Sequence, residues 1–400
     1  MSLYAHVPTA PADPILGIAD LVKADLRPDK ANLGIGVYQD AAGKLPLFAC
    51  VREAERRLAD AGVPRGYLAM DGDPVFAGLA RELVFGTDAA VVAEGRVVTV
   101  QTLAGTGALK IGATFLRATF PDATVMFSDP TWDNHEAVFG GAGFVTGRYR
   151  YYDPATRGVA ADAMLDDLCH AAPGTIVVLH ACCHNPTGCD LTADEWRAVL
   201  ETMGRRGLVA FIDMAYQGFA TSLEADPEPI RLALAEGVDC LVASSFSKNL
   251  GLYGERVGAL SLVCADAAEA DRVRSQVKLA VRANYSNPPT HGAALVRTVL
   301  GDPELRASWT RELAGMRDRI GAMRVALAER LVAAGVDDDV SFITTQRGMF
   351  SFSGLSPAQM ETLRRDWGVY GVDNGRLCVA ALNERNLDHV ASALAAVWHA

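Results

Sequence analysis

Short runs of β-branched and other apolar residues recur along the middle of the chain, each followed by small or polar residues. Five runs are candidate strands: RVVTVQT (96–102), TVMFSD (124–129), TIVVLHAC (175–182), LVAFID (208–213) and CLVASS (240–245). Glycine turns and amphipathic stretches separate them, which is the alternation that a parallel sheet covered by helices requires. The polar residues are expected at the carboxyl edge of the sheet, where such folds bind ligands. The pattern therefore predicts an α/β fold with a site at that edge.

A different pattern begins near residue 312. Residues 312–335 have helical periodicity without an interior proline, which predicts a connecting helix. Beyond it, SFITTQ (341–346), MFSFSG (349–354) and GRLCVAAL (375–382) have the pattern of strands, with a helix around 356–367. We therefore expect a large domain at 45–312, a smaller α+β domain at 313–400, and an N-terminal arm at 1–44 that forms part of the small domain.

Composition narrows the possible functions. The 400 residues are 50% hydrophobic and carry a formal net charge of −11, so the average surface of the protein would repel a nucleic acid or an anionic membrane. The amino terminus lacks the basic leader and apolar stretch of a secretory signal, and no apolar run approaches the roughly 20 residues that span a bilayer. The eight cysteines lack paired zinc spacing. We expect a cytoplasmic protein with reduced thiols and no membrane or nucleic-acid partner.

The segment AGTGALK (104–110) follows a candidate strand and opens a candidate helix. Backbone amides around Gly105, the helix dipole and the Thr106 hydroxyl would form a cup for a phosphate. The segment matches neither the ATP-binding nor the dinucleotide-binding glycine pattern, which favours a phosphate monoester. Glycines that merely turn a strand into a helix explain the segment about equally well when it is taken alone.

Lys248, in SSFSKN (244–249), comes just past a candidate strand. Most lysines in such a place are solvated surface charges. A lysine that is desolvated beside a cation such as Arg256 loses basicity and becomes a nucleophile able to condense with an aldehyde. In that interpretation Ser245 and Arg256 complete the phosphate cup.

Asp213 ends an apolar run in FIDMAYQG (211–218), and a carboxylate is costly to bury without a cationic partner. A protonated pyridine nitrogen is one such partner, and Tyr216 would offer a phenol to the same ring. The alternative is a structural aspartate that caps a turn or a helix.

The segment HACCHNPTG (180–188) contains two histidines and two cysteines but predicts no metal site. Cys182 and Cys183 are adjacent and would point to opposite faces of a strand, whereas zinc ligands are typically spaced by roughly two to four residues. We expect Asn185 to act as a hydrogen-bond donor and His180 to be structural.

Two further residues have the chemistry of ligand contacts. Trp132, in DPTWDNH (129–135), lies at a loop edge where its ring can stack on a flat cofactor, although tryptophan is more often plain core. Arg376 lies in the strand-like run GRLCVA (375–380), and a buried guanidinium requires an anion, either a ligand or a structural carboxylate. Arg282 precedes the polar turn NYSNPP (284–289), and nothing nearby gives it a role.

Taken together, HNPTG, SFSKN followed by GERVG, and the arginine strand resemble the class I aminotransferases of pyridoxal-phosphate fold type I. The chain is most similar to the aspartate and aromatic amino-acid aminotransferases, nearly end to end, from PADPIL and NLGIGVY to GMFSFSGL and GRLCVAAL. The resemblance implies a seven-stranded, mostly parallel sheet, a homodimer with shared active sites, and ping-pong transfer of an amino group to 2-oxoglutarate.

The resemblance also implies a role for each candidate residue. Lys248 would form a Schiff base with pyridoxal 5'-phosphate, and Asp213 would pair with its pyridinium nitrogen. The phosphate would be held by Gly105, Thr106, Ser245, Arg256 and, from the neighbouring subunit, Tyr67. The ring would contact Asn185, Tyr216 and Trp132, with His135 and His180 behind it near Asp213. The substrate would be bound by Arg376 at its α-carboxylate, by backbone near Gly36 and by the partner subunit's Arg282 at a distal carboxylate.

The residues that would indicate substrate preference point in two directions. Arg282, Val37, Thr106 and Asn287 resemble aspartate enzymes, whereas DPTWDNH, LYGERVGALS and the apolar Leu45 resemble aromatic ones. We expect dual specificity for aspartate and for tyrosine, phenylalanine and tryptophan. An aspartate aminotransferase with little aromatic activity is the alternative. A β-lyase or decarboxylase on the same fold, and a non-enzymatic binding protein, are more distant ones.

Overall fold

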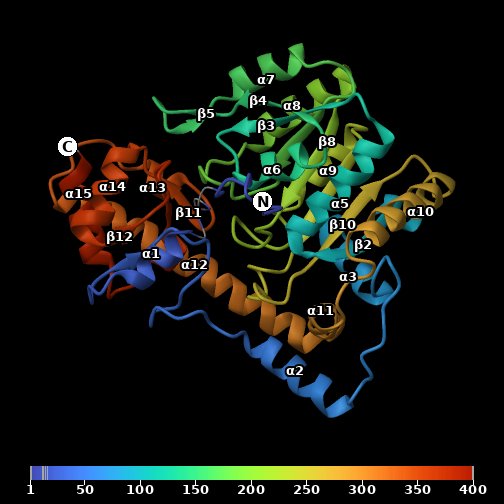
Figure 1. Cartoon of the computed structure of the whole chain (residues 1–400), viewed down its shortest axis with the longest axis horizontal. Helices are drawn as coiled ribbons and strands as arrows, with labels where there is room; N and C mark the ends of the chain where they lie inside the picture. Colours follow the sequence, from blue (N-terminus) through green and yellow to red (C-terminus); the bar gives the residue numbers. More distant parts are fainter. Residues whose placement is uncertain (1, 11–12, 14, 16, 399–400) are drawn as a thin grey trace.

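The computed structural model describes residues 2–10, 13, 15 and 17–398, and its largest element is a seven-stranded sheet (Figure 1). The strand order is β2-β10-β9-β8-β7-β3-β4, and β10 alone runs antiparallel to its two neighbours. The mostly parallel sheet predicted from the sequence is therefore confirmed. Its strands are β2 (Val97–Leu103), β3 (Thr124–Asp129), β4 (Val145–Arg150), β7 (Ile176–His180), β8 (Val209–Met214), β9 (Cys240–Ser245) and β10 (Val257–Val263).

Both faces of this sheet are buried because alternate residues of each central strand pack on opposite layers of helices. Val178 and Phe211 belong to one core cluster, with residues of α5 (Ala104–Thr119), α6 (Asn134–Gly140) and α10 (Ala267–Asn284). Val177 and Ile212 belong to another on the opposite face. That face is covered by α3 (Pro74–Phe85), α4 (Ala90–Ala93), α7 (Ala161–His170), α8 (Ala193–Arg206) and α9 (Glu228–Ala235). Burial on both sides explains the continuous apolar runs in the sequence.

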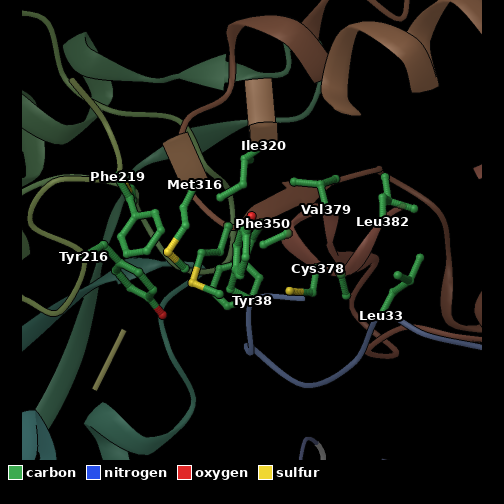
Figure 2. Close-up of a cluster of buried hydrophobic side chains, with 14 of the residues drawn as sticks. Leu33, Tyr38, Tyr216, Phe219, Met316, Ile320, Phe350, Cys378, Val379 and Leu382 are labelled. Carbon is green, nitrogen blue, oxygen red and sulfur yellow. The ribbon is translucent and has the colours of Figure 1, made fainter. Parts of the chain in front are cut away.

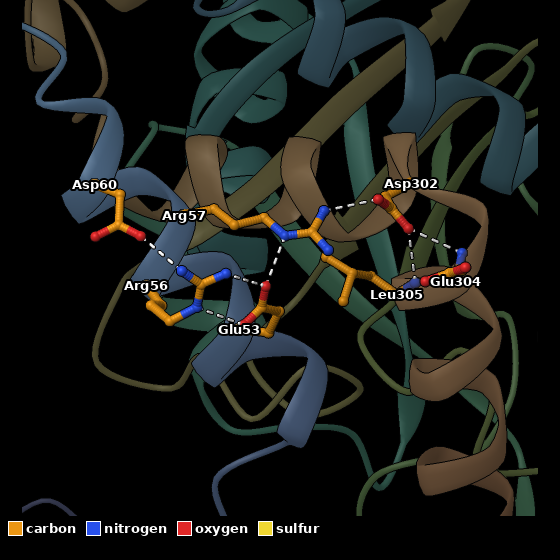
Figure 3. Close-up of polar contacts among 7 residues, drawn as sticks. All are labelled: Glu53, Arg56, Arg57, Asp60, Asp302, Glu304 and Leu305. Carbon is orange, nitrogen blue, oxygen red and sulfur yellow. Dashed lines mark hydrogen bonds and ion pairs between the residues drawn. The ribbon is translucent and has the colours of Figure 1, made fainter.

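Helix α12 (Pro303–Ala333) connects the sheet region to the C-terminal elements (Figure 1). It begins at Pro303 rather than at the predicted Glu312, because Asp302 caps it by accepting from the amides of Glu304 and Leu305. The other carboxylate oxygen of Asp302 pairs with Arg57 of α2 (Ala49–Ala61), which also pairs with Glu53 (Figure 3). The start of α12 is thereby tied to α2. Helix α11 (His291–Gly301) precedes it.

The C-terminal elements form a separate group with the first residues of the chain. Strand β1 (Ala31–Asn32) pairs with β12 (Val369–Tyr370), so this part of the N-terminal segment lies beside the C-terminal elements. Strand β11 (Phe350–Phe352) pairs with β13 (Arg376–Cys378). The other elements of this group are α1 (Gly17–Ala24), α14 (Pro357–Trp367), η1 (Val379–Ala381) and α15 (Leu387–Trp398), whereas the hairpin of β5 (Tyr152–Asp153) and β6 (Gly158–Val159) follows β4 of the large sheet. The exact domain limits at 44 and 312 stay predictions.

One strand prediction is wrong. Residues 341–346, expected as a strand, form the short helix α13 (Phe342–Thr345). The carbonyl of Ile343 accepts a hydrogen bond from Arg324, and Phe342 and Ile343 are buried. Packing against α12 therefore overrides the β-branched composition of this segment. The third predicted strand is also shorter, because it turns into η1 after Cys378.

A single apolar cluster joins the two groups of elements (Figure 2). Tyr216 and Phe219, from the loop after β8, meet Met316 and Ile320 of α12 beside Phe350. Tyr38, Leu33, Cys378, Val379 and Leu382 continue the cluster into the C-terminal elements. This cluster places β11 and β13 against the carboxyl edge of the large sheet.

Within the described residues, no helix is long and apolar enough to cross a membrane.

Candidate active site

A cavity of about 620 Å³ opens at the carboxyl edge of the large sheet, a size typical of small-molecule sites. Its walls come from the ends of β7, β8 and β9, from the starts of α5 and α6, and from β11 and β13. Most of the residues predicted from the sequence line it: Gly36, Gly105, Thr106, Trp132, His180, Asn185, Asp213, Tyr216, Ser245, Lys248, Arg256 and Arg376. The fold thus gathers residues that are dispersed over more than three hundred positions of the chain.

Gly105 and Thr106 lie in the first turn of α5, which begins directly after β2 as predicted. The free amides and the dipole of a helix start favour an anion. Ser245 lies opposite, since a Cβ added at Gly105 would be 3.4 Å from the Cβ of Ser245. Arg256 completes this cup, and its Nη1 donates to Tyr253 O at 2.9 Å and to Ser247 Oγ at 3.5 Å. The cup fits a phosphate.

Lys248 lines the cavity three residues after β9 ends. Loss of hydration lowers the pKa of its amine to about 8, and the positive charges of Arg256 and Arg376 act in the same direction against the carboxylate of Asp213. The amine lies 4.7 Å from the centre of the Tyr216 ring. An amine with such a pKa is partly neutral near neutral pH and can act as a nucleophile or a base.

Asp213, near the end of β8, is held by a chain of hydrogen bonds. Its Oδ2 accepts from His135 Nε2 at 3.1 Å, and His135 Nδ1 bonds to Thr131 Oγ1 at 2.9 Å. Burial is the largest single influence and acts to raise the pKa of the Asp213 carboxyl. The hydrogen bond from His135 and the charges of His135, His180 and Lys248 together outweigh it, so the pKa lies below its ordinary value. Oδ1 of Asp213 is buried and has no hydrogen-bond partner among the described residues. This carboxylate fits a cationic ring nitrogen in the cavity.

His135, His180 and Asp213 are also the one described group with metal-ligand geometry, their ligand atoms lying within 4.8 Å of one another. Both nitrogens of His135 are already engaged, however, in bonds to Asp213 and Thr131. Burial lowers the pKa of His180 to about 3, so its ring is neutral. We infer that the two histidines support Asp213 rather than bind a metal ion.

Arg376, the first residue of β13, is 3% exposed. Its Nη1 donates to Asn185 Oδ1 at 3.0 Å and its Nη2 to Gly34 O at 2.7 Å, while Nε has no partner in the described structure. Burial lowers the pKa of the guanidinium. Both hydrogen-bond acceptors of this guanidinium are neutral, and the carboxylate of Asp133 acts on it only through charge, without a hydrogen bond. The free Nε can therefore bind an anionic ligand such as a carboxylate or a phosphate.

Three predicted residues do not line this chain's cavity. Tyr67 is 94% exposed, and Arg282 is exposed, with Nη1 donating to Ser286 Oγ. Both were predicted to act in the site of a neighbouring subunit, and those roles stay predictions. His135 also lies outside the cavity wall, behind Asp213 as expected.

Some residues of the cavity were not found by the sequence reasoning, notably Tyr253, Ser247 and Phe350. Tyr253 and Ser247 lie in the same loop as Lys248 and Arg256, so proximity in sequence was the available signal. Phe350 carries no such signal, because an apolar residue in a short strand is ordinary core.

Comparisons with known proteins agree with this geometry. Residues 28–394 match the family described as aminotransferase class I and II. The aspartate aminotransferase of Pseudomonas aeruginosa is 51% identical over 397 residues, covering 99% of this chain and 100% of that protein. The aromatic-amino-acid aminotransferase of Escherichia coli is 47% identical over 398 residues, covering 99% and 100%.

The solved structures confirm the fold class as well. A crystal structure of an aromatic-amino-acid aminotransferase from Burkholderia pseudomallei, covalently bound to pyridoxal phosphate, superposes with a TM-score of 0.97 at 56% identity. The superposition covers 99% of this chain and 100% of the Burkholderia pseudomallei chain. With the family match over nearly the whole length, these similarities lead to one conclusion: the chain belongs to the class I and II aminotransferase family.

Proposed function

We propose that this aminotransferase uses pyridoxal 5'-phosphate to move the amino group between aspartate or an aromatic amino acid and 2-oxoglutarate. The observation that carries the proposal is the pairing, in one cavity, of an amine with a lowered pKa at Lys248 and a buried carboxylate oxygen without a partner at Asp213. An anion cup formed by Gly105, Thr106, Ser245 and Arg256 and a second guanidinium at Arg376 accompany them.

The residues present fit the cofactor. Gly105, Thr106, Ser245 and Arg256 would hold the phosphate, and Asp213 would keep the ring nitrogen protonated. Asn185, Tyr216 and Trp132 would contact the ring. When bound, pyridoxal 5'-phosphate supplies an aldehyde that accepts the amino group and a protonated ring that withdraws electrons. Lys248 would carry the cofactor and, once displaced by substrate, move the proton from the substrate Cα.

The carboxylates of the substrate would be bound by arginines. Arg376 offers two Nη donors and one unpartnered Nε inside the cavity, which suits an α-carboxylate. Gly36 lies in the segment over the cavity, and its backbone can close on the substrate. The partner subunit's Tyr67 would complete the phosphate site, and the partner subunit's Arg282 would complete the site for a distal carboxylate. The exposure of Tyr67 and Arg282 in this chain supports a homodimer with shared active sites.

Both substrate classes have support. One relative named for aspartate is 51% identical and one named for aromatic amino acids is 47% identical, and the structure from Burkholderia pseudomallei at 56% is an aromatic enzyme. We therefore favour dual specificity, with an aspartate aminotransferase of little aromatic activity as the alternative. A cytoplasmic location belongs to the same proposal, supported by a relative from rice named as cytoplasmic at 45% identity.

The decisive experiment is kcat/KM for aspartate, phenylalanine and tyrosine with 2-oxoglutarate as acceptor. Dual specificity predicts turnover of all three, with parallel double-reciprocal lines as ping-pong kinetics requires. Turnover of aspartate alone would select the alternative. If none of them changes the visible spectrum of the bound cofactor, the transaminase proposal is wrong.

A further inference from the structure

Tyr253 occupies a place in the cavity wall that neither the sequence motifs nor the proposed reaction explains. It lies in the loop between β9 and β10, which also carries Lys248 and Arg256. The two polar ends of this residue bond to two different parts of the site.

The main-chain oxygen of Tyr253 bonds on the cofactor side. It accepts from Arg256 Nη1 at 2.9 Å, the shorter of the two hydrogen bonds of that guanidinium. Arg256 has a φ of 53°, in the left-handed region that favours glycine. A residue other than glycine adopts this strained backbone conformation only where the surrounding structure holds it there. The carbonyl of Tyr253 is therefore part of what directs Arg256 at the anion cup.

The hydroxyl of Tyr253 bonds on the substrate side. It accepts from the backbone N–H of Tyr38 at 3.2 Å. Tyr38 ends the segment 35–38, whose residues Ile35, Gly36 and Val37 line the cavity. Burial raises the pKa of the Tyr253 hydroxyl, so it stays neutral at physiological pH.

Among the described residues, the other polar contacts that link this segment and the adjacent Gln39 to the rest of the protein come from the C-terminal group of elements or from α12. Cys378 Sγ donates to Val37 O at 3.7 Å, the amide of Gln39 donates to Ala380 O at 3.0 Å, and Arg319 lies 5.5 Å from the centre of the Tyr38 ring. Among the described residues, Tyr253 makes the only hydrogen bond between the segment 35–38 and the loop that holds Lys248.

We infer that Tyr253 is a positioning residue that ties the segment 35–38 to the arginine of the anion cup, so that its hydroxyl sets substrate affinity. The inference rests on the proposed function, because it takes the cup as the phosphate site and the segment 35–38 as the cover of the substrate. Without the hydroxyl, the N–H of Tyr38 loses its acceptor and the segment is held from the C-terminal side alone.

The test compares the wild-type holoenzyme with Tyr253→Phe, which removes the hydroxyl and keeps the ring and the carbonyl. We expect KM for aspartate and phenylalanine to rise about five-fold, the size of one neutral hydrogen bond, with kcat changed much less. The affinity for pyridoxal 5'-phosphate should stay the same, since the carbonyl contact to Arg256 remains. The dissociation constant of 3-phenylpropionate, a carboxylate without an amine, should rise by the same factor as KM, measured through the cofactor's absorbance.

Tyr149→Phe is the matched control. The Tyr149 hydroxyl donates to Val178 O at 2.8 Å inside the sheet and is not part of the cavity wall. Its loss should lower the thermal midpoint without changing KM or the binding of 3-phenylpropionate. Wild-type binding of 3-phenylpropionate by Tyr253→Phe would overturn the inference, as would an equal loss of cofactor affinity. A wild-type enzyme that transaminates neither substrate would instead refute the proposed function.

Discussion

The guanidinium carbon of Arg376 lies 4.2 Å from the centre of the Phe350 ring. The two residues belong to neighbouring antiparallel strands, β13 and β11, and Phe350 also contacts the Tyr216 ring edge-on at 5.9 Å between centres. The cation is thus supported on one face by an aromatic ring while its Nη atoms bond to Asn185 and Gly34. This arrangement fixes the direction in which Arg376 can bind an anion.

Replacing Arg376 with lysine keeps the charge but removes the fork of donors that a carboxylate requires. We expect KM for every amino-acid substrate to rise by about 10- to 100-fold, the range of one lost charged hydrogen bond. Steady-state kinetics with aspartate and phenylalanine measure it. Arg365→Lys, an exposed arginine paired with Asp366, is the control. Equal effects of the two changes would refute the assignment of Arg376.

Gly36→Ala should weaken substrate binding. A Cβ at Gly36 would lie 2.7 Å from Cζ of Phe350, so either the ring beneath Arg376 or the segment 35–38 must move. Overpacking of this kind costs about 1–3 kcal/mol, and we expect a KM increase of roughly ten-fold for both substrate classes. Gly321→Ala, in α12 with no atom within 4 Å of the added Cβ, should leave KM unchanged. An unaltered KM in Gly36→Ala would mean that the segment does not cover the substrate.

Covalent capture of the cofactor should depend on pH through Lys248. Burial lowers the pKa of this amine to about 8, so the neutral, nucleophilic form dominates above that pH. For cofactor-free protein, the rate at which Lys248 adds to pyridoxal 5'-phosphate should rise with pH and level off above about pH 8. Stopped-flow absorbance measures the rate, with N-acetyl-lysine amide as the reference. A rate that keeps rising through pH 10, as for an ordinary lysine, would contradict the assignment.

Asp213→Asn should keep the shape of the site and remove its charge. The amide can still bond to His135 but cannot stabilise a protonated ring nitrogen, so we expect kcat to fall by about 10²- to 10³-fold. Single-turnover kinetics with aspartate separate this effect from substrate binding, which should change little. The visible spectrum at the same pH supplies an independent measure of ring protonation. Full activity of the Asp213→Asn variant would show that the carboxylate has no role in the reaction.

Arg324→Met should lower stability more than any exposed arginine change on the same helix. Arg324 is 3% exposed, and its Nη atoms donate to Ile343 O, Gly348 O and Phe350 O at 2.9, 2.9 and 2.5 Å. Methionine leaves these buried carbonyls without donors, at a cost of about 3 kcal/mol. The thermal midpoint measures the loss. The control is Arg330→Met, which removes a solvent-accessible ion pair with Asp388 and one hydrogen bond to Ala326 O of the same helix. Equal midpoints for the two variants would show that the three hydrogen bonds contribute little.

The sequence determined the parts of the fold that depend on local pattern. Apolar runs followed by small polar residues located β2, β3, β7, β8 and β9 and their common carboxyl edge, because strands and helix starts depend on nearby residues. The same logic located the start of α5 at the glycines of the anion cup, and Lys248 just past β9. Roles within the site came from the resemblance to a family, since no local pattern distinguishes a catalytic lysine from a solvated one.

Tertiary structure alone decided which of these residues meet. Arg376 bonds to residues 191 and 342 positions away, and Asp213 pairs with a histidine 78 positions away. The link from Tyr253 to Tyr38 spans 215 positions, and Phe342–Thr345 forms a helix whose Ile343 carbonyl bonds to Arg324. Hydrogen bonds and side-chain packing act over a few ångströms in space whatever the separation along the chain. The partners of a buried polar group are therefore set by how the elements pack, and no window of sequence contains them.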